Sequence, residues 1–241
     1  NQLSRDFCEG NIDLDALFHP GAGYLSSSRN KKNLLAMMAT TAGFAIMFGA
    51  GFYEVLASAL AGFISGIGVY GGKKAGMQSF LVNCIGSFLL AVTSILCVHY
   101  LPGTMDLNVI IIASIMPLVP GVAITNAVYD TLHGDYISGA ARMLEAFVTA
   151  AAIAIGVGLG MLLLRPLGAV EKTDTGKKNE VKAKNMRIAG EIILKSLGAW
   201  VAIWGFSRLL NAPKKLECYT AGVGMIGWAV YLTWKYSTTA F

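Results

Sequence analysis

The residues best placed to do chemistry lie in the stretch Met116–Asp130, inside an apolar run that extends from about Leu107 to Leu132. At 1.5 Å per residue, this run is long enough to cross the roughly 30 Å hydrocarbon layer of a membrane. Pro117 and Pro120 interrupt its centre, because each removes a backbone donor and disfavours the α conformation of the residue before it. We therefore expect a broken helix. Broken backbone at membrane depth persists only when it is buried in protein or lines a wet cavity, although proline kinks also serve packing alone.

The break gives the second half of this span an N-terminus of its own near Gly121. Unpaired N–H groups and the positive end of the helix dipole at such a terminus suit a carboxylate ligand. Asn126 and Asp130 follow at i and i+4, on one face of the half-helix. The pattern is typical of a transport site, and the predicted substrate-binding residues are Pro117, Pro120, Gly121, Thr125 and Asn126.

A set of ionisable residues accompanies the break. The next predicted span, from about Tyr136 to Leu164, carries Arg142 and Glu145 at i and i+3, and ionisable groups at that depth usually face the interior of the helix bundle. With Asp130 they form a candidate set for proton coupling or carboxylate binding. If Arg142 reaches Asp130, the pair stays ionised and structural. If Arg142 pairs with Glu145, Asp130 is free to exchange protons. We favour the second arrangement, with Asp130 as the proton carrier and Glu145 as the next candidate.

The composition predicts an integral membrane protein, and the lengths of its apolar runs predict that it is all α. Of 241 residues, 55% are hydrophobic and only 14% charged, and the mean hydropathy is +0.58, well outside the range of soluble domains. The net charge of +5 does not indicate nucleic-acid binding, because the basic residues lie between apolar runs.

Metal, cofactor and enzyme functions find no support in the residue spacing. Four cysteines and three histidines are scattered without a C-x-x-C or Cys/His cluster. The spans carry no Ser/His, paired-Asp or metal-ligand spacing, so we expect no metal site, no cofactor and no enzymatic activity. Because the sequence opens on Asn1 and has no signal peptide, we expect a fragment or processed piece.

The chain divides into four predicted parts. Residues 1–32 form a cytosolic helical segment that ends in basic residues. Residues 33–164 form five spans, at about 33–50, 52–70, 79–100, 107–132 (the broken fourth) and 136–164. Residues 165–187 form a charged linker, and residues 188–241 hold two further spans, at about 188–210 and 218–236.

The linker presents a conflict of topology. It carries seven basic residues against three acidic ones, so the positive-inside rule keeps it in the cytoplasm, whereas five crossings place it outside. Either the fourth span is re-entrant or the linker is an exception to the rule. We favour the exception, because the end of the chain repeats its beginning.

That repeat is visible at a shift of 162 residues. The matched positions are Gly43-Phe44 with Gly205-Phe206, Ala50 with Ala212, Ala59 with Ala221, Gly62 with Gly224 and Ile64 with Ile226. An odd number of spans per repeat makes the second copy inverted, the architecture in which transporters place their site between repeats near the bilayer midplane. The second copy in this sequence comprises two spans and no broken helix.

Two motifs carry a family resemblance. Pro117–Asn126 (PLVPGVAITN) and Gly134–Arg142 (GDYISGAAR) resemble the first-repeat pattern of the threonine/serine exporter family, which includes split two-subunit relatives proposed as succinate exporters. The resemblance is strongest over residues 116–154 and looser over 3–164, and residues 204–213 resemble the start of the second repeat. It implies ten spans in two inverted halves, proton-driven export, and small amino or dicarboxylic acids as substrates.

The sequence thus predicts a multi-pass secondary transporter of the cell's inner (plasma) membrane that exports threonine and serine or a dicarboxylate such as succinate. Its expected partners are membrane lipid, the substrate, protons, and either further copies of the chain or a partner subunit that completes the second repeat, with no nucleic acid. The alternative is a non-transporting membrane subunit that scaffolds a partner supplying the missing spans.

Overall fold

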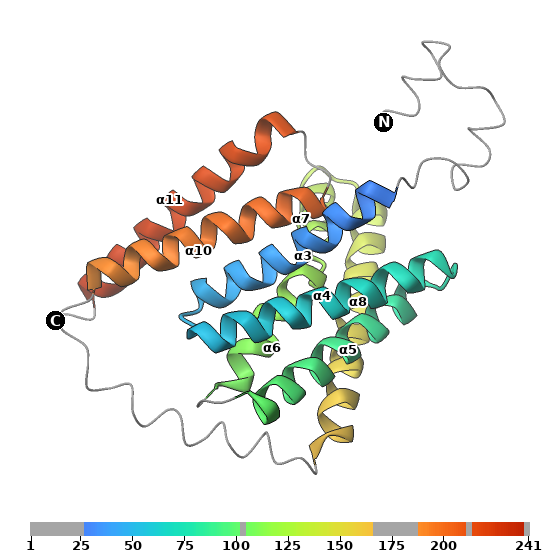
Figure 1. The fold of residues 1–241 in the computed structure, drawn as a ribbon. Helices are drawn as coiled ribbons and strands as arrows, with labels where there is room; N and C mark the ends of the chain where they lie inside the picture. Colours follow the sequence, from blue (N-terminus) through green and yellow to red (C-terminus); the bar gives the residue numbers. More distant parts are fainter. Residues whose placement is uncertain (1–26, 102–104, 166–187, 211–213, 239–241) are drawn as a thin grey trace. The chain divides into compact units, whose positions relative to one another are not determined.

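The computed structural model describes residues 27–101, 105–165, 188–210 and 214–238, and our predictions for residues 1–26 and for the linker at 166–187 lie outside these ranges. The described elements are helical: α3 (Ser27–Met47), α4 (Phe52–Lys74), α5 (Ser79–Tyr100), α6 (Leu107–Ile115), η1 (Met116–Leu118), α7 (Gly121–Leu132), α8 (Tyr136–Leu163), α10 (Ile188–Leu209) and α11 (Lys214–Thr238) (Figure 1). The chain divides into two compact units, residues 1–33 and 34–241, and the contacts below belong to the second.

The predicted all-α membrane class is confirmed. Within the described ranges, α4, α5, α8 and α10 are long and apolar enough to cross a bilayer, and α6 with α7 forms a fifth candidate, bent by 54° at the break. The apolar part of α3, Asn33–Met47, is shorter than a full span. Helix α11 is long enough, but it does not meet the hydropathy and charge criteria that the other spans meet. Glycine, threonine, tyrosine and tryptophan residues are spread along α11 and lower its hydropathy.

The direction of α8 bears on whether the broken span crosses the membrane. A Cβ on Gly156 would lie 3.0 Å from Phe88 N, and one on Gly160 would lie 2.7 Å from Ala91 Cβ, so α5 and α8 run in the same direction where they touch. A re-entrant fourth span would return the chain to the side it came from and make them antiparallel. The arrangement therefore favours a broken span that crosses.

The main apolar core joins α4, α5 and α6, and it fixes the first half of the broken span. Its buried residues are Ala57, Ala61, Leu90, Ile95, Cys97, Val98, Met105, Leu107, Ile110 and Ile111. Glu54 strengthens this attachment, because its carboxylate accepts hydrogen bonds from the Gly51 N–H and from the Asp106 N–H, both at 2.6 Å. Asp106 is the N-cap of α6, so Glu54 connects the start of α4 to the start of the broken span.

Helices α3 and α10 meet through small residues. A Cβ on Gly43 would lie 2.7 Å from Ala202 Cα and 2.8 Å from Gly198 O, while a Cβ on Gly205 would lie 3.0 Å from both Ala36 O and Thr40 N. As residue numbers rise along α3 they fall along α10, so the two helices are antiparallel. The contact brings the two backbones close together, as small residues allow in membrane helix pairs.

Candidate functional site

The break lies between α6 and α7, where the sequence predicts it. The 3₁₀ turn η1 contains Pro117, Val119 is extended, and Pro120 is the N-cap of α7. A short-range hydrogen bond from Gly121 N to Val119 O, 2.8 Å long, closes the bend. The two prolines cannot donate, so the helical hydrogen-bond ladder stops here and a new helix begins.

The new N-terminus at Gly121 is open. No side chain caps α7, and the first backbone bond returned to the break is Ile124 N to Pro120 O, 3.1 Å. The N–H groups of Val122 and Ala123 have no acceptor in the part of the chain that the structure describes. A Cβ on Gly121 would meet no atom within 4 Å. These donors remain available to a carboxylate, together with the positive end of the helix dipole.

An apolar groove of about 440 Å³ lies against the break. It is lined by Ile115, Val119, Pro120, Ala150, Ile153, Ala154, Val157, Gly158 and Met161. Ala150, Ala154 and Gly158 place the small side chains of α8 opposite the turn. Since the apolar part of α8 continues to Leu163, the break lies well inside the hydrophobic length of this helix.

The other predicted binding residues lie on α7 beyond its open end. The Thr125 hydroxyl donates to Gly121 O at 2.9 Å, so its proton is engaged within the helix while its oxygen can still accept. Asn126 is half-buried, and among the described residues no hydrogen-bond partner satisfies its amide. An amide whose carbonyl oxygen and NH₂ group are both unpaired can orient a polar ligand by accepting from it and donating to it.

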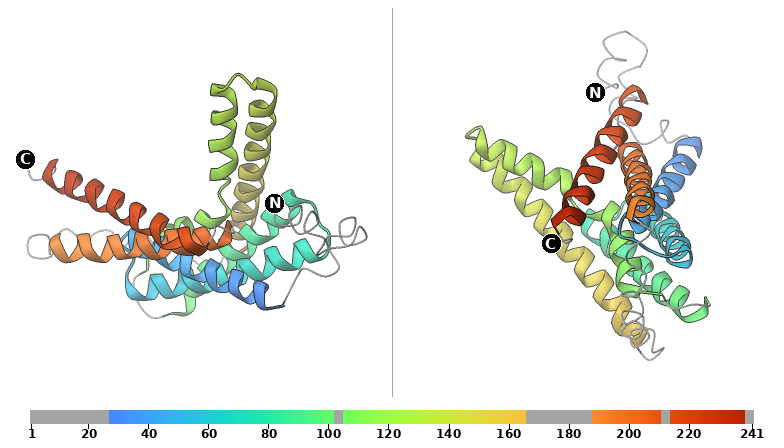
Figure 2. Two further views of the ribbon diagram at one scale, coloured as in Figure 1. Left: turned by 90° about the horizontal axis from the view of Figure 1, so that it is seen from above. Right: turned by 90° about the vertical axis from the view of Figure 1, so that its left-hand side faces the viewer.

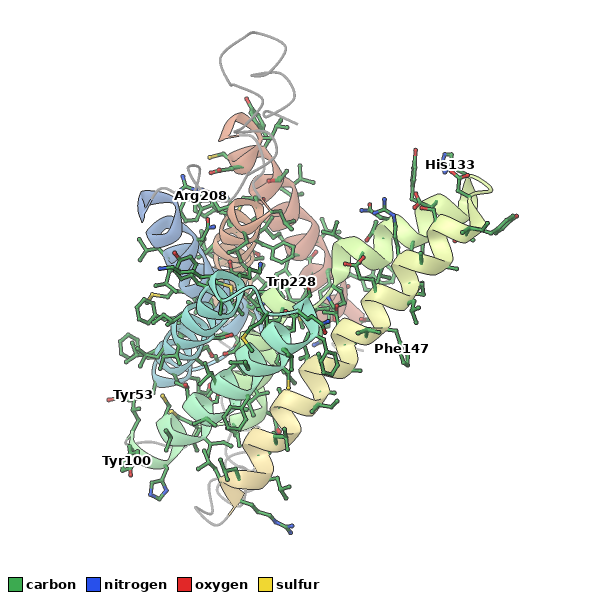
Figure 3. All side chains as sticks on the ribbon, turned by 90° about the vertical axis from the view of Figure 1, so that its right-hand side faces the viewer. Tyr53, Tyr100, His133, Phe147, Arg208 and Trp228 are labelled. Atoms are coloured by element: carbon green, nitrogen blue, oxygen red, sulfur yellow. The ribbon has the colours of Figure 1, made fainter. Side chains whose placement is uncertain are left out.

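Helices α7 and α8 form an antiparallel hairpin. Gly134 adopts a φ of +90°, which stops α7, and α8 starts two residues later. A Cβ on Gly139 would lie 2.9 Å from Ala127 O, so the two backbones are in close contact. In both views of Figure 2 the tip of this hairpin stands away from α4 and α5, whereas the C-terminal half of α8 packs against α5. Figure 3 shows His133 at the tip.

The charged residues of the hairpin pair differently from our expectation. Arg142 Nε lies 2.8 Å from Asp130 Oδ2, and the Ser138 hydroxyl donates to the same oxygen at 2.8 Å. The preferred Arg142–Glu145 pair is therefore wrong. The antiparallel packing sets Asp130 across from Arg142, and Glu145 is exposed with no ion pair among the described residues.

The predicted site residues thus fall into two groups at opposite ends of α7. Asp130 lies nine positions after Gly121, about 13 Å along a helix axis. One small metabolite does not touch both. The structure places the open N-terminus and the groove at the break, and the Asp130–Arg142 pair near the tip of the hairpin.

Two residues that hold the elements of the site in place were not predicted from the sequence. Ser138 donates a hydrogen bond to the Asp130 carboxylate. The short turn at Gly134 could have indicated this contact, because such a turn brings the residues on its two sides opposite one another. Glu54, which no local motif singles out, accepts a hydrogen bond from the N–H of Asp106, 52 residues away. No local pattern reports a contact of that separation.

These features define a multi-pass helical membrane protein with a proline-broken span and open helix donors at the break, as transporters have. Residues 1–164 match the model of a protein family described as "Putative threonine/serine exporter". The chain belongs to this family, and the predicted resemblance is confirmed. No curated protein and no solved structure shows a significant match to the chain.

Proposed function

We propose that this protein takes part in the export of small carboxylate-bearing metabolites, threonine and serine before dicarboxylates such as succinate, across the plasma membrane. The observation that carries the proposal is the break itself. It leaves the N–H groups of Val122 and Ala123 without acceptors at an open helix end, and such half-helix termini bind substrate carboxylates in transporters. Asn126 orients the substrate from one turn further along α7.

Glu145 is our candidate for the proton-coupling group. It is exposed and makes no ion pair among the described residues, so its carboxylate is not engaged in a structural contact of the kind that Asp130 makes. Asp130, held by Arg142 and Ser138, instead ties α7 to α8. Both contacts engage the Asp130 carboxylate across the hairpin, which suits a structural role better than proton exchange.

We also propose that α10–α11 is an inverted copy of α3–α4. Two kinds of contact support a shift of 162 residues. Gly43 of α3 contacts Gly198 of α10. Gly205, the equivalent of Gly43, contacts Ala36, the equivalent of Gly198. Such reciprocal contacts occur across a two-fold axis. In addition, Gly62 abuts Thr41 of α3, and its equivalent Gly224 abuts Ile203 of α10, the equivalent of Thr41.

Efflux of labelled metabolites from membrane vesicles tests the proposed function. Vesicles that contain the protein should release threonine and serine faster than vesicles without it, and dissipating the proton gradient should slow the release. Labelled succinate, run in parallel, separates the two substrate classes. Equal efflux with and without the protein for all three compounds would contradict the proposal.

A further inference from the structure

Helix α5 carries one side-chain amide, that of Asn83, which is half-buried. It makes no hydrogen bond with the residues that the structure describes. A half-buried amide without a partner is unfavourable in a membrane-spanning helix, because it loses water without gaining a hydrogen bond. Polar side chains in such helices usually face the bundle interior, where they contact another helix or a substrate. The position of Asn83 relative to the break decides between these roles.

Asn83 lies at the level of the break along the bundle. Helices α5 and α8 run in the same direction, and the packing of Gly156 on Ser87, 69 positions earlier, sets their register. The same shift places Asn83 within one residue of the level of Ile153. Ile153 lines the groove together with Pro120, the N-cap of α7. Asn83 is therefore level with the start of the new helix.

The face of α5 that carries Asn83 is the face that packs against the broken span. Leu90 and Ser94, seven and eleven residues further on, share this face and are fully buried. Leu90 belongs to the apolar core together with Ile110 of α6, whereas Leu81, nearly opposite on α5, is exposed. At the level of Asn83, α6 has ended and α7 leaves at an angle of 54°. This explains why Asn83 is half-buried where Leu90 is fully buried.

Asn126 lies on the side of α7 that is nearer to α5. The ion pair between Asp130 and Arg142 identifies this side. Arg142 precedes Gly156, which packs on α5, by fourteen residues, about four helical turns, so both lie on the same face of α8. Asp130 therefore faces the α5 side of the hairpin, and Asn126, one turn earlier, shares its face. The amides of Asn83 and Asn126 thus lie on the same side of the break, on two different helices.

The helices around the break offer a substrate no charged side chain at this level. No Asp, Glu, Lys or Arg occurs in their inner stretches, residues 55–72, 79–98, 107–129 and 146–163. The N–H groups of Val122 and Ala123 can bind one carboxylate, but a second carboxylate would find no cation. An unpaired charge away from water is costly. An ammonium group, in contrast, can donate to the carbonyl oxygen of an amide.

We propose that the amide oxygen of Asn83 accepts a hydrogen bond from the ammonium group of an amino acid whose carboxylate lies at the N-terminus of α7. This inference rests on the proposed function and adds a specificity to it. A zwitterion brings no net charge to the break, whereas a dicarboxylate brings two negative charges to one set of donors. Asn83 thus makes the site select zwitterionic amino acids over dicarboxylates.

The concentration dependence of efflux from vesicles tests this inference. Vesicles with wild-type, Asn83→Ala, Asn83→Asp or Asn108→Ala protein are loaded with a series of threonine concentrations, and the half-saturating concentration is measured. A parallel series uses 3-hydroxybutyrate, which is threonine without its amino group. Asn108 is the matched control, because it is an exposed asparagine at the start of α6, away from the break.

We expect Asn83→Ala to raise the half-saturating concentration of threonine about tenfold, since one hydrogen bond to a charged group is lost, and to leave that of 3-hydroxybutyrate unchanged. Asn83→Asp keeps an acceptor oxygen, so it should remain near wild type for threonine, as should Asn108→Ala. An unchanged threonine value in Asn83→Ala, an equal rise for both compounds, or Asn83→Asp as weak as Asn83→Ala would overturn the inference.

The wild-type protein separates this inference from the proposed function. Wild-type vesicles that release threonine no faster than vesicles without the protein would overturn the proposed function and this inference with it. Wild-type release of threonine combined with unchanged Asn83→Ala protein would overturn the role of Asn83 alone.

Discussion

Replacing Asp130 by asparagine should weaken the α7–α8 hairpin, because it removes the charge that Arg142 Nε contacts at 2.8 Å. Exposed ion pairs contribute about 0–1 kcal/mol, and breaking a buried pair costs about 3–5 kcal/mol. The Asp130 side chain is 20% exposed and that of Arg142 is 47% exposed. We therefore expect a coupling energy of about 1–2 kcal/mol, between the two classes.

A double-mutant cycle isolates this energy. Asp130→Asn, Arg142→Gln and the double variant are compared by their free energies of unfolding, measured by denaturant titration in mixed micelles. Glu145→Gln is the matched control, since it removes a carboxylate of the same hairpin that has no ion pair among the described residues, and its stability should be unchanged.

Measuring export by the Asp130→Asn and Glu145→Gln variants completes the comparison, because the two carboxylates have different proposed roles. Asp130→Asn should keep the pH dependence of export even where abundance falls, whereas Glu145→Gln should lose it. A coupling energy below about 0.3 kcal/mol, combined with lost pH dependence in stable Asp130→Asn protein, would refute the reasoning and make Asp130 the proton carrier.

Three further predictions follow from the packing and the topology. Thr175→Cys, in a background without native cysteines, should react with an impermeant thiol reagent from outside, because the antiparallel α3 and α10 require an even number of crossings between them, which α4, α5, the broken span and α8 supply; labelling only after membrane disruption would contradict this. Glu54→Ala should lower the free energy of unfolding by about 1–3 kcal/mol through the loss of two hydrogen bonds to a charged acceptor, and unchanged stability would show that α6 needs no such attachment. Gly156→Ala should destabilise by about 1–3 kcal/mol because its Cβ would meet the α5 backbone. Gly158→Ala, with no atom within 4 Å, should be neutral or slightly stabilising; equal stability losses would show that α5 and α8 do not pack as described.

The backbone of the site was predictable because its determinants are local. Pro117 and Pro120 lack donors wherever they occur, so a broken helix followed from the sequence, and the structure places the new helix start at Gly121. Gly134 ends α7 for a similarly local reason, since its positive φ costs little only in glycine.

The partner of Arg142 was not predictable in the same way. Spacing alone offers Glu145 at i+3, whereas Asp130 comes within reach only after α7 folds back onto α8. Glu54 and Asp106 illustrate the same limit at greater separation. Local patterns determine where helices begin and end, but the choice between charged partners depends on which helices pack together.

The repeat was only partly predictable from the sequence. Its sequence signal consisted of a few matches among apolar residues, such as Gly62 with Gly224, and apolar composition alone produces some of them. The contacts add what the sequence lacks, because Gly62 and Gly224 each abut the equivalent residue of the preceding helix.

The most direct test of the central claim, that the break forms the substrate site, is threonine and serine efflux from vesicles carrying Pro117→Ala/Pro120→Ala protein. Alanine restores the missing donors and helix propensity, so the span should straighten and the open N-terminus at Gly121 should disappear. Pro166→Ala, a proline outside the predicted spans, is the control. We predict that efflux falls sharply in the double variant while membrane insertion and the control are unaffected; wild-type efflux from correctly inserted double-variant protein would contradict the account.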